Sequence, residues 1–199
     1  PKNIMRRPIH ARIDLAALRH NHAVARKHAG DVSLWSVIKA NAYGHGAIET
    51  AQALIRQSLG YLAVFSIDEA IALRQAGIAV SIVVLGPFVP QQIEDIIVHR
   101  LTPVVSDRSL LEAMADATHA RPTPYPIHLK VETGMNRLGL TQDDLETLFK
   151  KHMFPHSLHL EGLMSHLADS DGDAQEITEA QIARFNQALN VARSGGYEV

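Results

Sequence analysis

The 199-residue sequence contains no cysteine, which excludes disulfide bonds, thiolate nucleophiles and cysteine-ligated metals. It also has no apolar run that approaches the roughly 18 residues of a membrane span. The formal net charge is -2 and no basic tract occurs, so electrostatics give no argument for binding nucleic acid or a membrane surface. Residues 1–10 are basic but lack the apolar segment of a secretory signal. We therefore expect a cytoplasmic globular protein without nucleic-acid or membrane partners.

Short apolar, β-prone runs alternate with amphipathic helical patterns along the whole chain. This alternation is typical of repeated βα units around a parallel sheet. The first expected helix, 15–29, is preceded by Asp14, a residue type common at helix N-caps, and followed by Gly30, a residue type common at helix C-termini. The expected strands are 9–14, 34–38, 61–66, 81–85, 102–106, 127–132 and 158–164, with the start of another at 197–199. The expected helices are 15–29, 47–59, 67–76, 91–99, 108–118, 142–152 and 175–194.

The number of these units bears on the fold class. A chain of this length can form one domain that buries roughly 70% of its unfolded surface, and no interior linker divides residues 1–199. About six βα units follow the first strand, whereas eight close a (β/α)8 TIM-type barrel. Six units would leave unpaired edges. The α/β sheet is therefore either open and doubly wound, or the N-terminal part of a barrel in a longer polypeptide.

One lysine ends a short apolar strand. The run Leu34–Ile38 is β-prone and is followed by Lys39 and a loop rich in small residues. Ligands bind at the carboxyl ends of strands in α/β proteins. A lysine there becomes a nucleophile when desolvation or a neighbouring cation lowers its pKa. The alternative is a lysine whose stem packs on the strand while its amine reaches water.

The residues around Lys39 make a more specific pattern. The run Val-Ile-Lys-Ala-Asn-Ala-Tyr-Gly-His-Gly at 37–46 resembles the pyridoxal-phosphate-binding signature of bacterial alanine racemases over nearly all ten positions. The resemblance implies that Lys39 forms the internal aldimine with pyridoxal 5'-phosphate and acts as one of two catalytic bases. It also implies that Tyr43 hydrogen-bonds the cofactor phosphate. For His45 we expect a loop histidine satisfied by backbone, and for Gly44 and Gly46 a sharp turn before the next helix.

A second stretch, 128–139, ends a strand and presents an arginine. Arginine keeps its charge at working pH and offers a fork of donors, so Arg137 could hold an anion or simply pair with Glu132. The stretch resembles the second alanine racemase motif, lysine-x-(Asp/Glu)-Thr-Gly-Met-x-Arg-x-Gly, with Glu132 where aspartate is common. The resemblance implies that Arg137 contacts both cofactor and substrate carboxylate. It also implies that Lys130 is carbamylated and orients Arg137; an unmodified, solvent-directed Lys130 is the alternative.

A third stretch, 162–171, contains a histidine directly after a strand. A histidine there is usually a satisfied structural residue. The run resembles the racemase pattern Met-Ser-His-(Phe/Leu)-Ala-x-x-Asp, which implies that His166 packs by the cofactor ring and does not transfer protons. Spaced histidines at 152, 156 and 159 do not converge, because Pro155 interrupts any helix between them. We therefore predict no metal site.

Together, the motifs imply an alanine racemase that supplies D-alanine for peptidoglycan. Members of that family have an N-terminal eight-stranded α/β barrel and a mainly β C-terminal domain, which is absent from these residues. They act as homodimers in which a tyrosine from the partner's C-terminal domain is the second base. We therefore expect these 199 residues alone to be inactive. The alternatives are a racemase for serine or another amino acid, a single-domain pyridoxal-phosphate-binding homeostasis protein without turnover, or a structural protein that binds no cofactor.

Overall fold

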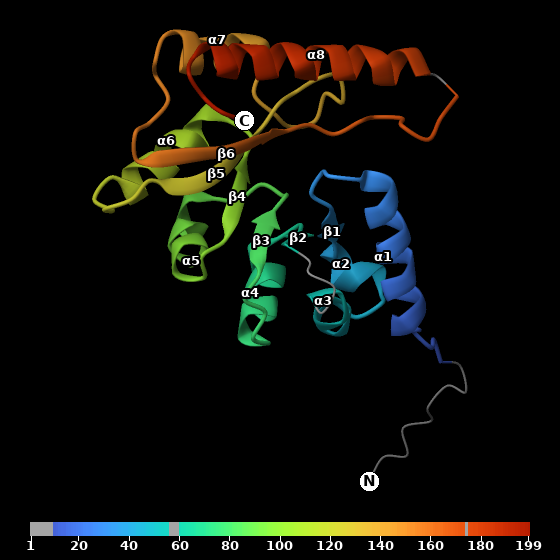
Figure 1. Ribbon diagram of the computed structural model, residues 1–199. Coiled ribbons are helices and arrows are strands. Elements are labelled where there is room, and N and C mark those ends of the chain that lie inside the picture. Colours follow the sequence, from blue (N-terminus) through green and yellow to red (C-terminus); the bar gives the residue numbers. More distant parts are fainter. Residues whose placement is uncertain (1–9, 56–59, 174) are drawn as a thin grey trace.

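The computed structural model describes residues 10–55, 60–173 and 175–199. Its centre is a parallel six-stranded sheet (Figure 1). The strands are β1 (Trp35–Val37), β2 (Tyr61–Val64), β3 (Ser81–Val84), β4 (Thr102–Val105), β5 (Tyr125–Lys130) and β6 (Leu158–Met164). The helical elements are α1 (Leu15–Ala29), α2 (Lys39–Tyr43), α3 (Ala47–Ile55), α4 (Ile67–Gln75), η1 (Pro90–Gln92), α5 (Ile93–Val98), α6 (Arg108–Thr118), α7 (Gln142–Lys150) and α8 (Gln175–Ser194).

The strands lie side by side in the order of the sequence, β1 to β6. A doubly wound sheet reverses its order at a switch point, and this sheet has no reversal. Right-handed crossovers in one direction place all connecting helices on the same side. Figure 1 shows helices α3 to α8 around the outside of the strands. The alternative of an open, doubly wound fold is therefore wrong, and the singly wound order of a βα barrel is confirmed.

The sheet also curls. In a flat sheet, β1 and β5 would be about 19 Å apart, since neighbouring strands are about 4.8 Å apart. The ring of Trp35 on β1 nevertheless lies 5.2 Å from the ring of His128 on β5, in an edge-to-face contact. Trp35 also stacks on Tyr61 of β2 with 4.9 Å between ring centroids. These aromatic contacts lie on the concave side of the sheet, which corresponds to a barrel interior.

Several helix and strand boundaries were predicted correctly from the sequence. The Asp14 carboxylate accepts hydrogen bonds from the backbone N–H groups of Ala16 and Ala17, at 2.8 and 3.1 Å, and α1 has its predicted bounds. The bounds of α6, β6 and α8 are also as predicted. Residues 56–59 of the helix expected at 47–59 lie outside the described residues, and the described part of that helix is 47–55.

Two expected strands do not form. Residues 10–14 of the run 9–14 are exposed and not in a strand, and residue 9 lies outside the described residues. Residues 197–199 are likewise not in a strand; instead the Tyr197 ring packs on Phe149 and Phe154 at 4.9 and 5.2 Å. An alternating pattern needs a neighbouring strand for its hydrogen bonds, and neither segment has one among the described residues.

Within residues 10–55, 60–173 and 175–199, no helix is both long enough and apolar enough to cross a membrane.

The core lies between the convex side of the sheet and the helices, and includes Leu62, Ile82, Ile127, Leu129 and Phe149. A buried tyrosine on β5 joins helix α5 to the residue that precedes β4. The Tyr125 hydroxyl lies 2.9 Å from the carbonyl oxygen of Ile96 and 2.8 Å from that of Leu101. Burial is the main reason that the pKa of Tyr125 rises to about 12.

We expect Tyr125→Phe to lower the free energy of unfolding by about 1–2 kcal/mol at pH 7, because a buried carbonyl loses its donor. Between pH 10 and 12 the unfolded state releases the tyrosine proton before the folded state does, so wild-type stability falls as pH rises. The fall is up to roughly 2.7 kcal/mol for a two-unit difference, and Tyr125→Phe should lack it. Urea denaturation at pH 7 and 11 measures both effects.

Tyr61→Phe is the control, since the hydroxyl of Tyr61 bonds no described residue. If Tyr125→Phe loses as much unfolding free energy between pH 7 and 11 as wild type does, the assignment is contradicted.

Candidate active site

Four basic side chains gather at the carboxyl edge of the sheet. Lys39 follows β1, Lys130 ends β5, Arg137 lies in the loop after β5, and His166 follows β6. Burial and then the charges of Arg137 and Lys39 lower the pKa of Lys130, while Glu132 opposes the shift. Partial desolvation and then Arg137, Lys130 and Lys39 lower the pKa of His166. The structure thus brings together four side chains that were predicted from separate motifs.

The backbone after Lys39 is left-handed. Ala40, Asn41 and Ala42 have φ and ψ between 45° and 54°, and Tyr43 has a φ of 53°. None of these residues is glycine, and left-handed helical geometry costs L-residues about 1–2 kcal/mol each. Gly44 then adopts a φ of 85° and donates its N–H to the carbonyls of Ala40 and Asn41. Strain of this kind persists only where surrounding contacts impose it, and it is concentrated at functional sites.

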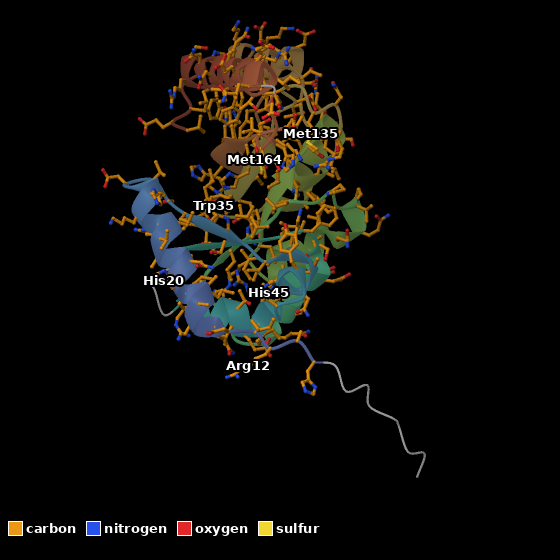
Figure 2. All side chains as sticks on the ribbon, turned by 90° about the vertical axis from the view of Figure 1, so that its right-hand side faces the viewer. Arg12, His20, Trp35, His45, Met135 and Met164 are labelled. Carbon is orange, nitrogen blue, oxygen red and sulfur yellow. The ribbon has the colours of Figure 1, made fainter. Side chains whose placement is uncertain are left out.

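Two side chains hold this turn. The Glu69 carboxylate on α4 accepts the N–H of Ala40 at 2.6 Å. The Asn41 side-chain oxygen accepts the N–H of Ala47, the first residue of α3, at 2.8 Å. His45 lies between the turn and α3 (Figure 2), and its Nδ1 is 2.9 Å from the carbonyl oxygen of Ala42. The expectation that backbone satisfies His45 is therefore confirmed.

Tyr43 extends from the end of the turn and is 62% exposed. The Lys39 amine lies 6.0 Å from the centre of its ring. The Tyr43 side chain is thus exposed to solvent and lies near the Lys39 amine.

Lys130 is only 7% exposed, and its amine makes no hydrogen bond or ion pair within the described ranges. A buried amine close to other cations is costly in its charged form, which is why the pKa of Lys130 is lowered. Neutral amines are nucleophilic. A larger fraction of Lys130 is therefore in the neutral, nucleophilic form than of an ordinary exposed lysine.

The loop after β5 is organised by Glu132. Its carboxylate accepts the backbone N–H groups of Gly134 and Arg137. Hydrogen bonds of this kind lower the pKa of Glu132, although partial burial opposes the shift. The Arg137 side chain is exposed, and across the described residues no ion pair joins its guanidinium to Glu132. Its charge is therefore available to a ligand.

A buried polar network joins this loop to the one after β6. Gln181 on α8 is 1% exposed and donates to the Thr133 hydroxyl at 3.1 Å and to the His166 carbonyl at 3.0 Å. Its side-chain oxygen accepts the N–H of Ala168 at 2.8 Å. Arg184 donates to the Thr133 carbonyl at 2.7 Å, passing so close to Gly134 (φ 137°) that a Cβ there would lie 2.8 Å from its nitrogen. The network fixes the loops that carry Arg137 and His166.

Two of these residues were not found from the sequence. Glu69 carries a signal, the capping box Ser66-x-x-Glu69, but that pattern does not reveal the bond to Ala40. Gln181 carries no signal, since a helical glutamine is usually exposed. Within the part of the chain that the structure describes, no group of three or more histidine or acidic side chains could hold a metal ion.

The model of the family "Alanine racemase, N-terminal domain" matches residues 13–199. The alanine racemase of Carboxydothermus hydrogenoformans is 36% identical over 193 residues, which is 97% of this chain and 52% of that protein. The chain thus spans about half the length of the curated relatives it matches.

Solved structures agree. The alanine racemase of Clostridium difficile 630 superposes with a TM-score of 0.87 at 28% identity, covering 94% of this chain and 50% of that one. The alanine racemase of Bartonella henselae, described with covalently bound pyridoxal phosphate, has a TM-score of 0.83 at 27% identity, covering 90% and 52%. The six-stranded sheet corresponds to the N-terminal barrel of these enzymes. With the family match over nearly its whole length and this structural likeness, the chain belongs to the alanine racemase family, whose N-terminal domain it represents.

Proposed function

We propose that the full-length protein is an alanine racemase, which interconverts L-alanine and D-alanine with pyridoxal 5'-phosphate and supplies D-alanine for peptidoglycan. The observation that carries this proposal is the position of Lys39, held by a left-handed turn at the carboxyl edge among Lys130, Arg137 and His166.

The residues present fit this cofactor. A phosphate ester and a substrate carboxylate bring several negative charges, and the basic side chains of Lys39 and Arg137 at this edge provide complementary positive charge. Lys39 offers the primary amine that a covalent bond to the cofactor aldehyde requires. Pyridoxal phosphate, when bound, supplies an electron sink for the charge left at the α-carbon when its proton is removed.

Each side chain then has a distinct task. Lys39 anchors the cofactor, and its amine, once released, moves the α-proton on one face of the substrate. Tyr43 donates its hydroxyl to the phosphate. Arg137 binds the cofactor oxygen and the substrate carboxylate as a fixed cation. His166 packs by the cofactor ring.

Lys130 is proposed to carry a carbamate. The neutral amine would form a bond to the carbon of carbon dioxide and release a proton to solvent, which leaves an anion near Arg137. This change removes the repulsion between the Lys130 ammonium and the Arg137 guanidinium and gives Arg137 a partner. Carbon-13-labelled bicarbonate should produce one carbamate NMR signal per chain that Lys130→Arg lacks. A signal that survives Lys130→Arg would refute this assignment.

The rest of the proposal concerns groups outside these residues. We infer that residues 1–199 are the incomplete N-terminal barrel domain, that the enzyme is a cytoplasmic homodimer, and that the second base comes from the partner subunit. These 199 residues alone are then inactive, because only one face of the substrate has a base.

The test combines trapping and turnover. The full-length protein is incubated with pyridoxal phosphate, reduced with borohydride and mapped by peptide mass. The adduct is expected on Lys39, and conversion of L-alanine should exceed that of L-serine. An adduct with no turnover of either amino acid would indicate a binding protein, faster turnover of serine would reassign the substrate, and no adduct on Lys39 would overturn the proposal.

A further inference from the structure

Glu69 makes an unusual set of contacts for a helix-capping residue. One carboxylate oxygen accepts the N–H groups of Phe65 and Ser66, at 2.8 and 3.1 Å. The other accepts the N–H of Ala40, at 2.6 Å, from a segment 29 residues earlier in the chain. The Ser66 hydroxyl completes the capping box by accepting the N–H of Glu69. A single carboxylate therefore ties the end of β2 to the residue that follows Lys39.

The chain contains a second capping box that lacks this third partner. At the start of α7, Asp144 accepts the N–H and the hydroxyl of Thr141, at 2.9 and 2.7 Å, and Thr141 accepts the N–H of Asp144. Capping α7 thus needs only the shorter aspartate. The Glu69 carboxylate caps α4 and also accepts the Ala40 N–H, a bond that capping itself does not require.

The N–H of Ala40 belongs to the peptide group that begins with the Lys39 carbonyl. Fixing that N–H fixes the plane of the peptide, and with it the backbone torsion that sets the direction of the Lys39 side chain. It also fixes the first residue of the left-handed turn, where a non-glycine residue is strained without a specific contact. Among the described residues, no hydrogen bond or ion pair joins the Glu69 carboxylate to the Lys39 amine or to the side chain of another residue assigned to the cofactor.

We propose that Glu69 is a positioning residue for Lys39: through the Ala40 N–H it holds the left-handed turn and aims the lysine amine. This inference rests on the proposed function, since it assigns Glu69 to the residue that binds the cofactor and moves the proton.

Glu69→Asp separates capping from positioning. Aspartate at this helix position can still accept the Ser66 N–H, as Asp144 does for Thr141, but it is one methylene too short to reach Ala40 as well. Glu69→Gln keeps the length but replaces one acceptor oxygen with a donor, so it must abandon either Ala40 or the β2 end. Asp144→Asn is the matched control, because it weakens a capping box that touches no part of the Lys39 turn.

The experiment uses the full-length protein and three readouts: the melting temperature, the rate at which Lys39 forms a borohydride-trapped adduct with pyridoxal phosphate, and the division of the defect between kcat and KM. For Glu69→Asp we expect a melting temperature within a few degrees of wild type, adduct formation at least about tenfold slower, and kcat lowered by about 10–100-fold, as small misplacements of reacting groups cause. KM should change less than kcat. Asp144→Asn should lower only the melting temperature.

The two proposals fail in different ways. Wild-type rates of adduct formation and turnover in both Glu69→Asp and Glu69→Gln would overturn the positioning role while leaving the proposed function intact. If wild type forms no adduct, the proposed function fails; acetylation of Lys39 relative to the exposed Lys151 then still reads the position of the amine. If the ratio of Lys39 to Lys151 acetylation is the same as in wild type in both Glu69 variants, the positioning role is overturned by this measurement as well.

Discussion

Replacing Lys39 with alanine in the full-length protein is expected to lower kcat for the conversion of L-alanine to D-alanine by at least about 1,000-fold. A positioned general base contributes about 10²–10⁴-fold by itself, and the same side chain anchors the cofactor in the proposed function. Because a racemase uses the same group in both directions, conversion of D-alanine should fall equally. Lys39→Arg should be as inactive, since arginine stays protonated and cannot accept the α-proton. Kinetic assays in both directions measure these effects.

The matched control is Lys151→Ala, which removes an exposed lysine after α7 and should leave kcat unchanged. Methylamine in the assay should partly restore Lys39→Ala, because a small amine fits the space left by the side chain, and should not restore Lys39→Arg, where that space is filled. If Lys39→Ala retains more than about a tenth of wild-type kcat, a role worth several powers of ten is excluded.

The sequence predicted the position of Lys39 but not the shape of the backbone around it. Strand β1, the loop and the glycines at 44 and 46 follow from local patterns. The four non-glycine residues in left-handed geometry do not, because each one alone prefers the right-handed region. Two hydrogen bonds impose that geometry: one from Ala40 to Glu69, which is distant in the chain, and one from Ala47 across the loop to Asn41. Local propensity cannot reveal it.

The same distinction explains the strand errors. Strand β6 and helix α8 were predicted with their observed bounds, since each has a clear period and clear ends. The run at 9–14 has a strand-like alternation, yet its described part is exposed and unpaired. Alternation indicates which faces a strand would have, whereas a strand exists only where a neighbour accepts its hydrogen bonds. The gathering of Lys39, Lys130, Arg137 and His166 was predictable, because parallel strands bring their carboxyl ends to one edge.

Gln181→Leu is expected to cause the largest loss of stability among single substitutions near the site. Leucine fills a similar volume but leaves the Ala168 N–H and the His166 carbonyl without their partner, and removes one bond to the Thr133 hydroxyl. A fully buried polar group left unsatisfied costs about 1–3 kcal/mol; because the Ala168 N–H and the His166 carbonyl are only partly buried, the free energy of unfolding should fall by about 2–3 kcal/mol. Urea denaturation of the full-length protein measures this as a lower midpoint with an unchanged slope.

Gln187→Leu is the control on the same helix. Gln187 is exposed, so the same change of side chain should alter the free energy of unfolding by less than about 0.5 kcal/mol. Gln181→Glu should be at least as harmful as Gln181→Leu, because a carboxylate has no N–H for Thr133 or His166 and would be buried with its charge. If Gln181→Leu instead denatures like Gln187→Leu, the network is not what holds the Arg137 and His166 loops. The conformations of these two loops would then depend only on the turn held by Glu132 and on strand β6.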